Sequence, residues 1–333
     1  MTIARCLLLS VVLLRAEGFL APSRRVGGRA HARPAATLEE APAPLPDALA
    51  GPFGATIGGG PATLKAQVLQ LGAALDRGQM YNPTSGAQYS ERMRTAVRKI
   101  EELVACAPPL PTSLDAIEGE WELVLSSVPH GIFRSSPFFL AVQEAFNAGE
   151  GTSGPFEGVQ DKSNLFFKLH ELQTCSWGVS KIGRVAQRVD AASGYLFSEF
   201  DTTIFSLTVI PVLGWFKLLP TFGGCVITAS KATLEADGKI AMEVDYTTSR
   251  PVPGLSGLGK WIWSIKVPVG AVWKLLPWNK GRAATCSVFL RYVDDDFRIV
   301  QDVDGEWFVY TRPVATIALS NEEQERVNLL GGN

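Results

Sequence analysis

The chain has 333 residues, of which 46% are hydrophobic and 19% are charged, with 31 basic and 33 acidic side chains. This composition excludes wholesale disorder, and the length suits one large domain or two small ones. No apolar run reaches the roughly 18–20 residues that a membrane-spanning helix needs. The nearly balanced charge, without a basic stripe or zinc-finger spacing, argues against nucleic-acid binding.

The beginning of the chain is predicted to be a leader and not part of the fold. Residues 1–18 combine Arg5 with a short apolar stretch and small residues, which is typical of a secretory signal peptide. Phe19 follows directly, and residues 19–60 begin with an Arg-rich stretch without acidic residues, which is typical of a transit peptide. This order resembles the two-part leaders of algae with secondary plastids. The alternative is a secreted protein with a disordered basic stub.

Removal of residues 1–36 would make the remaining chain acidic. Six of the 31 basic residues and one of the 33 acidic residues lie in that range, so the remainder carries a net charge of −7 with His neutral. Such a protein cannot rely on bulk attraction to an anionic membrane, and its contact with lipid has to be local or hydrophobic. Residues 37–60 are rich in Pro, Ala and Gly and are predicted to form a linker.

Two amphipathic helices are expected within residues 63–106. Thr63 is the expected N-cap of the first helix, which ends near Gly78, and the second runs from about Ser90 to Ala105, where prolines follow. Apolar residues recur in both at three- and four-residue steps, so each helix has one apolar stripe. The stripes comprise Leu64, Val68, Leu71 and Leu75 in the first helix and Met93, Val97, Ile100 and Val104 in the second.

From residue 117 onward the apolar residues alternate, which predicts strands. Trp121, Leu123 and Leu125 are expected to share one face of the first strand. Asp237-Gly238 and Asp304-Gly305 predict hairpin turns. Eight or nine strands without long helices between them predict an antiparallel barrel or sandwich, and a barrel is favoured because it leaves no sheet edge exposed. The further strands are predicted at residues 165–169, 195–205, 225–234, 239–247, 285–292, 297–300 and 307–310.

The chain lacks the usual catalytic motifs. It has no G-x-S-x-G nucleophile elbow, no P-loop and no G-x-G-x-x-G. Of its three histidines, His31 lies in the leader, and His130 and His170 alone are too few to favour a triad or a histidine metal site. We therefore predict no enzyme, no catalytic residue, no cofactor and no metal site. The cysteines are scattered singly, without disulfide or metal-ligand spacing, at positions 6, 106, 175, 225 and 286.

Residues 294–296 form a run of three aspartates. A calcium loop alternates its ligands and closes with a bidentate Glu, and neither feature is present. We interpret the run as a solvated turn that pairs with a nearby arginine.

Three stretches together resemble the plastid lipid-associated protein family, also called fibrillins or plastoglobulins. They are Leu71–Gly78, which is similar to an L-x-R-G helix end; Ile117–Ser127, which is similar to an entry strand with a G-x-W step; and Arg291–Val309, which is similar to the closing strands of the family. The corresponding domain spans residues 61–315, with its barrel at 117–313 and a tail at 316–333.

The resemblance implies a lipocalin-like antiparallel β-barrel preceded by two short amphipathic helices. It implies a non-enzymatic protein of thylakoids or plastoglobules that binds carotenoids, prenylquinones, or galactolipid or fatty-acid derivatives. In such barrels a Gly-x-Trp step opens the first strand, which here is Gly119 and Trp121. Arg298 or Arg312 is the expected cation that stacks on this tryptophan and closes the barrel base. The alternative is that Trp121 is simply a core aromatic residue.

Two similar segments, 211–223 and 255–280, combine tryptophan with lysine and leucine. Tryptophan beside lysine suits a membrane interface, because the indole lies at the head-group level while the amine reaches water. Prolines interrupt both segments, so we expect loops around the barrel mouth that contact lipid; the alternative is that they fold inward and fill the barrel. The candidate lipid-contacting residues are Trp215, Phe216, Trp261, Trp263, Trp273 and Trp278.

Other function classes stay open at this point. An enzyme on a lipocalin-like barrel, acting on a carotenoid or a quinone, would need carboxylates inside the barrel. Glu199 and Asp201, and likewise Glu243 and Asp245, share a strand face because they are two residues apart, and the outward, solvated placement is the favoured one. A structural coat protein of lipid droplets is a third alternative.

Overall fold

The computed structural model describes residues 60–79, 86–128, 131–148, 180–204, 222–250, 265–275, 279 and 281–315. The predicted signal and transit segments, the linker before residue 60, the strand expected at 165–169 and the tail at 316–333 lie outside these residues. The helices are α2 (Pro61–Ala74), α3 (Gly86–Val104), α4 (Gly131–Arg134), α5 (Pro137–Asn147) and α8 (Val269–Leu275), with 3₁₀ turns η2 (Asp76–Gly78) and η4 (Leu114–Ile117). The strands are β1 (Gly119–Ser126), β2 (Ser180–Asp190), β3 (Tyr195–Ile204), β4 (Phe222–Leu234), β5 (Lys239–Ser249), β6 (Thr285–Val293), β7 (Phe297–Asp302) and β8 (Trp307–Thr311).

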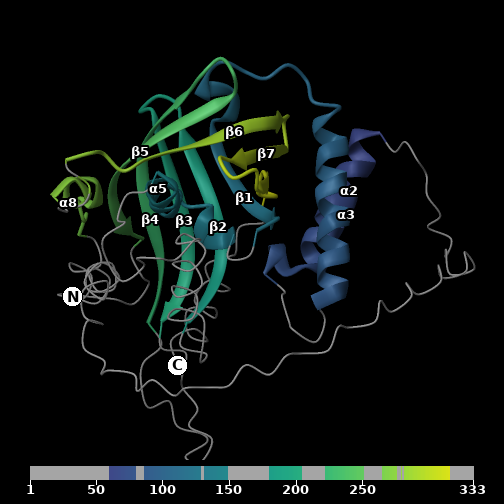
Figure 1. Ribbon diagram of the computed structural model, residues 1–333, viewed down its shortest axis with the longest axis horizontal. Helices are drawn as coiled ribbons and strands as arrows, with labels where there is room; N and C mark the ends of the chain where they lie inside the picture. Colours follow the sequence, from purple (N-terminus) through teal and green to yellow (C-terminus); the bar gives the residue numbers. More distant parts are fainter. Residues whose placement is uncertain are drawn as a thin grey trace, which may run out of the picture.

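The eight strands form one antiparallel sheet that closes in a ring. Each strand pairs with the next one in the sequence, and β8 pairs with β1 to complete the circuit. The two hairpins that the sequence predicts are confirmed: β4–β5 turns at Gly238 and β7–β8 at Gly305, and both glycines have positive φ. Figure 1 shows the strongly twisted sheet with α2 and α3 beside it. The mainly β, antiparallel prediction is therefore confirmed.

Helices α2 and α3 pack side by side on the outer face of the ring. The predicted stripe residues Val68, Leu75 and Ile100 are buried, as are Ala96 and Leu103, which the pattern did not include. The first helix begins at Pro61, with Gly60 as N-cap, so the prediction of Thr63 as N-cap is wrong. Proline is favourable at the first helical position because its missing N–H has no partner there in any helix.

The side chains of strand β1 do not alternate regularly between the two faces of the sheet along its whole length. Trp121 and Leu123 point into the ring, but Leu125 packs against the outer helices, so the prediction that all three share a face is wrong for Leu125. The pairing of β1 with β8 shifts between Leu123 and Leu125. Such a bulge moves the following side chain to the other side of the sheet.

The aspartate run joins α2 to the ring. Lys65 Nζ lies 2.6 Å from Asp294 and 2.5 Å from Asp296, so the predicted pairing with an arginine is corrected to a pairing with lysine. Burial alone would raise the pKa of Asp294, but hydrogen bonds from Lys65 and Tyr292 hold it below its ordinary value. The run is thus a turn that closes the β6–β7 connection and contacts a helix.

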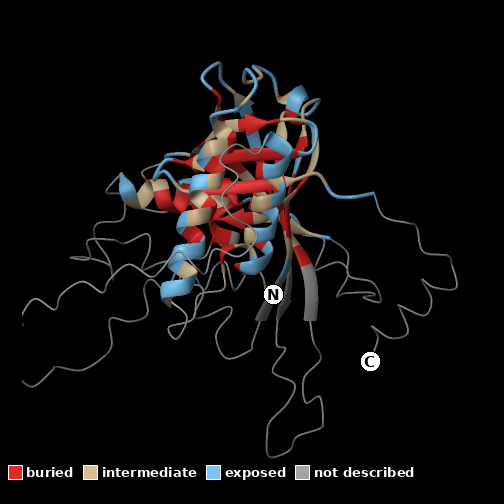
Figure 2. Cartoon of the chain, turned by 90° about the vertical axis from the view of Figure 1, so that its right-hand side faces the viewer, coloured by how far each residue is buried: buried red, intermediate tan, exposed pale blue. Residues whose placement is uncertain are grey.

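Helices α4 and α5, residues 131–147, enter the ring, and we call them the plug. Leu140 and Ala141 belong to one buried cluster that includes residues from all eight strands, with Val300 as the member from β7. Figure 1 shows α5 nearly end-on within the curved sheet, and Figure 2 shows the buried residues gathered at the centre of the molecule. No pattern in the sequence predicted this helix or strand β2. Residues 255–280 were expected to form only loops, but residues 269–275 form helix α8.

Candidate functional site: the interior of the ring

At one end of the ring, which we call the base, a tryptophan lies beside two arginines. Trp121 is fully buried, and its indole Nε1 donates a hydrogen bond of 2.9 Å to the carbonyl of Ile117. The guanidinium of Arg298 lies 5.0 Å from the indole ring and that of Arg312 lies 3.9 Å from it. Both arginines that the sequence offered for this position therefore contact Trp121, one from β7 and one just after β8.

Gly119 makes room for this arrangement. Its φ is +96°, and a Cβ atom at this position would lie 2.6 Å from Nη1 of Arg312. The same nitrogen donates a hydrogen bond to the carbonyl of Glu118. The Gly-x-Trp step thus serves the local geometry of the base, because a side chain at 119 would displace the guanidinium.

Arg298 lies inside the ring and is fully buried. Its Nη2 donates a 2.5 Å hydrogen bond to Gln187 of β2, and its guanidinium lies 4.6 Å from the ring of Tyr310. Burial lowers the pKa of Arg298 to about 10. Among the described residues, its Nε and Nη1 atoms have no hydrogen-bond partner, and no carboxylate is paired with it.

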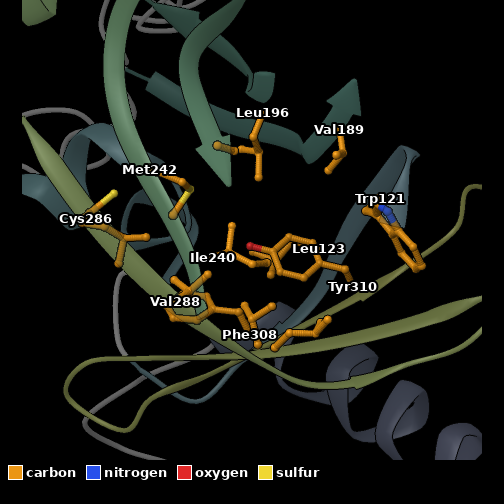
Figure 3. Packing of buried hydrophobic residues seen from close by; sticks show 14 of the residues in the cluster. Trp121, Leu123, Val189, Leu196, Ile240, Met242, Cys286, Val288, Phe308 and Tyr310 are labelled. Carbon is orange, nitrogen blue, oxygen red and sulfur yellow. The ribbon is translucent and has the colours of Figure 1, made fainter. Parts of the chain in front are cut away.

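The plug reaches this arginine through Ser135. The carbonyl of Ser135 accepts a 2.9 Å hydrogen bond from Gln187 Nε2, and its side chain hydrogen-bonds with Tyr310. Burial raises the pKa of Tyr310 to about 12, so its hydroxyl is neutral at physiological pH. Figure 3 shows Tyr310 pointing into the space that Ile240, Leu123 and Phe308 also line.

A buried ion pair holds the plug at the β7–β8 hairpin. Arg134 Nη2 lies 3.3 Å from Asp302, and the two side chains are 4% and 0% exposed. Gln143 of α5 donates to the same carboxylate, at 3.3 Å, and to Asp304, at 2.5 Å. The other oxygen of Asp302 accepts the backbone N–H groups of Asp304 and Glu306. The carboxylate of Asp302 therefore both shapes the hairpin and seats the plug.

Glu144 of α5 contacts the strand edge nearby. Its Oε1 accepts a 2.7 Å hydrogen bond from the backbone N–H of Ser287, at the part of β6 that precedes the pairing with β7. Partial burial nevertheless raises the pKa of Glu144 above its ordinary value.

Three buried serine hydroxyls have no hydrogen-bond partner among the described residues. Ser198 and Ser230 lie on the inner faces of β3 and β4, beside the interior residues Leu196 and Val244, and Ser136 precedes α5. Buried hydroxyls usually have a partner, so the interior has spare hydrogen-bonding capacity.

Three of the four candidate carboxylates, Glu199, Glu243 and Asp245, face outward from the ring. Val244 is 1% exposed and belongs to the interior cluster, so Glu243 on the same strand faces outward, where Lys274 pairs with it at 3.2 Å. Asp245 accepts a hydrogen bond from Tyr195 on the outer face. Glu199 also faces outward but is 4% exposed, paired with Arg184 and Arg250. The three carboxylates therefore face outward, which is the placement that the sequence favoured, and two arginines cover Glu199.

Of the six candidate lipid-contacting residues, only Trp273 lies within the described residues; Trp215, Phe216, Trp261, Trp263 and Trp278 lie outside them. Trp273 of α8 is half-buried, and its ring centroid lies 6.3 Å from that of Phe138 in the plug. The neighbouring Leu275 is 82% exposed. Within α8, the tryptophan thus packs against the plug and a leucine projects outward.

In the described part of the chain, no helix is both long and apolar enough to cross a membrane. Over the same residues, no group of three or more His, Cys, Asp or Glu side chains could hold a metal ion. Cys225 and Cys286 are buried thiols, and burial raises the pKa of both, that of Cys225 to about 12. Comparison with protein-family models, with curated proteins and with solved structures returns no match.

Sequence reasoning located the base of the ring but missed the plug and its partners. Arg134, Gln143 and Asp302 belong to no motif, and no pattern in the sequence predicts their contacts. Gln187 was missed together with β2. The available signal was the cluster of apolar residues from Phe138 to Val142, which is too short to distinguish a buried helix from a strand by its pattern.

Proposed function

We propose that this chain is a non-catalytic lipid-associated protein of plastids, similar to the fibrillins, whose ring is a lipocalin-like barrel that binds hydrophobic small molecules. The ligands would be carotenoids, prenylquinones, or galactolipid or fatty-acid derivatives. The single observation that carries the proposal is the closed antiparallel ring, in which every strand pairs with its sequence neighbour around an apolar interior. Small barrels of this kind enclose one small ligand in other proteins.

The base of the ring supports the same proposal. A tryptophan at the start of the first strand, with Arg298 of β7 and Arg312 just after β8 against its ring, matches the closure that the resemblance to lipocalin-like barrels implies. Closing one end leaves the other as the entrance. The plug enters from that other end, at the β7–β8 hairpin and the beginning of β6.

Membrane association is proposed for the entrance. The ends of β3 and β5 and the beginning of β4 lie at this end of the ring, because Ile204 pairs with Phe222 and Val226 pairs with Ser249. These are the strand ends that flank the two tryptophan-lysine segments. Leu275, exposed beside Lys274, has the combination of apolar surface and cation that suits a thylakoid or plastoglobule surface.

Lipid extraction of the purified protein tests the binding function. We expect native mass spectrometry to show a one-to-one complex with an apolar plastid component, and delipidated protein to take up the same component from a pigment and lipid extract. Protein that carries no ligand before or after incubation with the extract would contradict the proposal.

Flotation with galactolipid vesicles tests the membrane association. Replacing Trp215, Leu275 and Trp278 together by Ser is expected to reduce the floated fraction, because burial of these side chains at the interface contributes several kcal/mol at about 25 cal/mol per Å² of apolar surface. The matched control is Trp177→Ser, which lies outside both segments. Equal flotation of the triple variant and the wild type would overturn this part. Fusion of residues 1–36 to a fluorescent protein tests the plastid location separately.

A further inference from the structure

We propose that the interior of the ring binds the ionised carboxylate of a long-chain ligand, with Arg298 as the counter-ion. This inference rests on the proposed function, since it specifies the chemical class of the ligand. It selects fatty acids and related acids over neutral carotenoids and quinones.

The charge of Arg298 is the first reason. The two deeply buried arginines of the described interior differ sharply in their partners. Arg134 has Asp302 and Asp304, whereas Arg298 has two aromatic rings and the amide oxygen of Gln187. A buried guanidinium without an anion is unfavourable, and a ligand carboxylate would supply the missing charge.

The unused donors of Arg298 are the second reason. Nε and Nη1 are buried and have no partner, and both belong to a side chain that points into the ring. Gln187 accepts from the guanidinium through its amide oxygen, the Tyr310 ring lies 4.6 Å from the guanidinium, and both side chains hydrogen-bond with Ser135. A buried guanidinium with unused donors, beside two further side chains that can donate, is suited to a carboxylate.

The plug occupies part of the space beside the guanidinium of Arg298. Ser135 accepts the hydrogen bond of Gln187 and bonds to Tyr310, so its oxygen atoms stand where the carboxylate oxygens would bind. A ligand therefore has to displace residues 131–147, and its acyl chain would take the space of Leu140 and its neighbours among the interior residues.

The contacts that hold the plug in the ring favour its displacement by a ligand. Its contacts to the β7–β8 hairpin are polar: Arg134 and Gln143 to Asp302 and Asp304. The attraction within a buried ion pair is largely offset by the desolvation of its members, and both recover water when the pair separates. The unpartnered hydroxyls of Ser136, Ser198 and Ser230 also show that this closed packing leaves polar groups unsatisfied.

The wild-type protein allows the first test. Equilibrium binding of oleate is compared with that of methyl oleate, which keeps the chain and removes the charge. We expect oleate to bind about 10- to 100-fold more tightly, the range of charge-assisted hydrogen bonds. Equal affinities would overturn the head-group inference while leaving the proposed function intact. If neither compound nor a plastid lipid extract binds, the proposed function fails as well.

The second test examines the contact itself. The ¹³C resonance of carboxyl-labelled oleate reports its ionisation, and we expect the bound carboxyl to stay ionised to a lower pH than in water, because it faces Arg298 with the neutral Tyr310 and Gln187 beside it. In Arg298→Met the preference for oleate should fall to near one, and the bound carboxyl should titrate at a higher pH than in the wild type, because burial without a counter-ion favours its neutral form. A merely structural Arg298 would leave the ligand titration of a folded variant unchanged, and this result would overturn the proposal.

Folding of the variants is checked by thermal unfolding. If Arg298→Met does not fold, Arg298→Lys retains the charge but loses the planar fork, and Tyr310→Phe removes one donor; each is expected to reduce the oleate preference in part. Peptide-resolved labelling of Cys286 reports the plug, because its Sγ lies 3.3 Å from the carbonyl of Pro137 and is buried. Oleate should accelerate this labelling, and unchanged labelling with bound oleate would contradict displacement of the plug.

Discussion

Two buried clusters of the molecule are built from different kinds of residue. The outer cluster, between α2, α3 and the outside of the ring, consists of hydrophobic side chains such as Val68, Ile100 and Phe297, and the Lys65 ion pairs lie at its margin. The inner cluster, inside the ring, shares its space with charged and polar groups. These are Arg134, Gln143, Gln187, Ser198, Ser230, Arg298 and Asp302.

This difference predicts that the two clusters contribute unequally to the free energy of unfolding. Apolar surface removed from water stabilises a fold directly, and the outer cluster gives the helices a position without any polar specification. Buried polar groups contribute little net stability, and an unpaired one is unfavourable. We infer that the inner cluster contributes less to the free energy of unfolding than the outer cluster, because its polar groups are arranged for ligand binding. The following substitutions test this contrast between the two clusters.

The largest effect is expected for Asp302→Ala. This change removes a fully buried carboxylate and leaves Arg134 with less compensation, and loss of one member of a buried pair destabilises by about 3–5 kcal/mol. Urea unfolding measures the loss, and Asp304→Ala, at a 36% exposed carboxylate, should cost much less. The double change Arg134→Met with Asp302→Asn keeps an acceptor for the backbone N–H groups of Asp304 and Glu306 and should recover most of the stability; if it does not, the inner pair is a net stabilising element and the contrast fails.

The second effect is a loss of about 2–5 kcal/mol in Ile100→Ala, because this fully buried side chain leaves a cavity between α3 and the ring. Leu69→Ala, at a 40% exposed position of α2, is the matched control and should lose far less. Ligand binding should be unchanged in both folded variants. A specific loss of binding in Ile100→Ala would show that the two clusters are not separate.

The third effect concerns pH and Glu144. Its pKa is raised in the folded state, so the native protein binds this proton more tightly than the unfolded chain does. Its contribution to stability is therefore greatest below the unfolded pKa of about 4.3 and declines as the pH rises through the folded value. Glu144→Gln should remove this decline, because the amide oxygen can still accept from Ser287. Unfolding at pH 4 and pH 7 measures it, with Glu101→Gln as control.

The smallest effect is expected for Ser230→Ala. Its hydroxyl is fully buried and without a partner, so removing it should leave the free energy of unfolding unchanged or raise it slightly. Ser127→Ala is the matched control: its Oγ accepts a 2.8 Å hydrogen bond from Trp307 N–H, and its loss should cost about 1 kcal/mol. An equal loss in both variants would show that Ser230 has a partner and would weaken the case for a polar interior open to a ligand.

The elements that the sequence predicted correctly are those with one buried face. The stripes of α2 and α3 and the alternation in β5 and β6 arise because each element lies between core and solvent, and the period of its apolar residues reports that position. The Asp-Gly turns were predictable because a positive φ favours glycine wherever it occurs.

The elements that it missed lack such a face. Helix α5 is buried from Phe139 through Gln143, since it lies inside the ring, and a helix buried all round has no stripe. In β2 the pairing shifts between Ile182 and Val185, and its inward residues include the polar Gln187, so the alternation is lost. The same kind of shift in β1 sent Leu125 to the outer cluster.

The sequence by itself determined the antiparallel class, both hairpins and the two outer helices, and it offered Arg298 or Arg312 as the cation beside Trp121. Only the tertiary structure decided that both arginines contact the indole, that the plug fills the ring, and that Asp302 pairs with Arg134, 168 residues away along the chain. Periodicity records whether a residue faces core or solvent, because that depends on its immediate neighbours. Which charge meets which depends on how the whole sheet closes, and no local pattern contains that information.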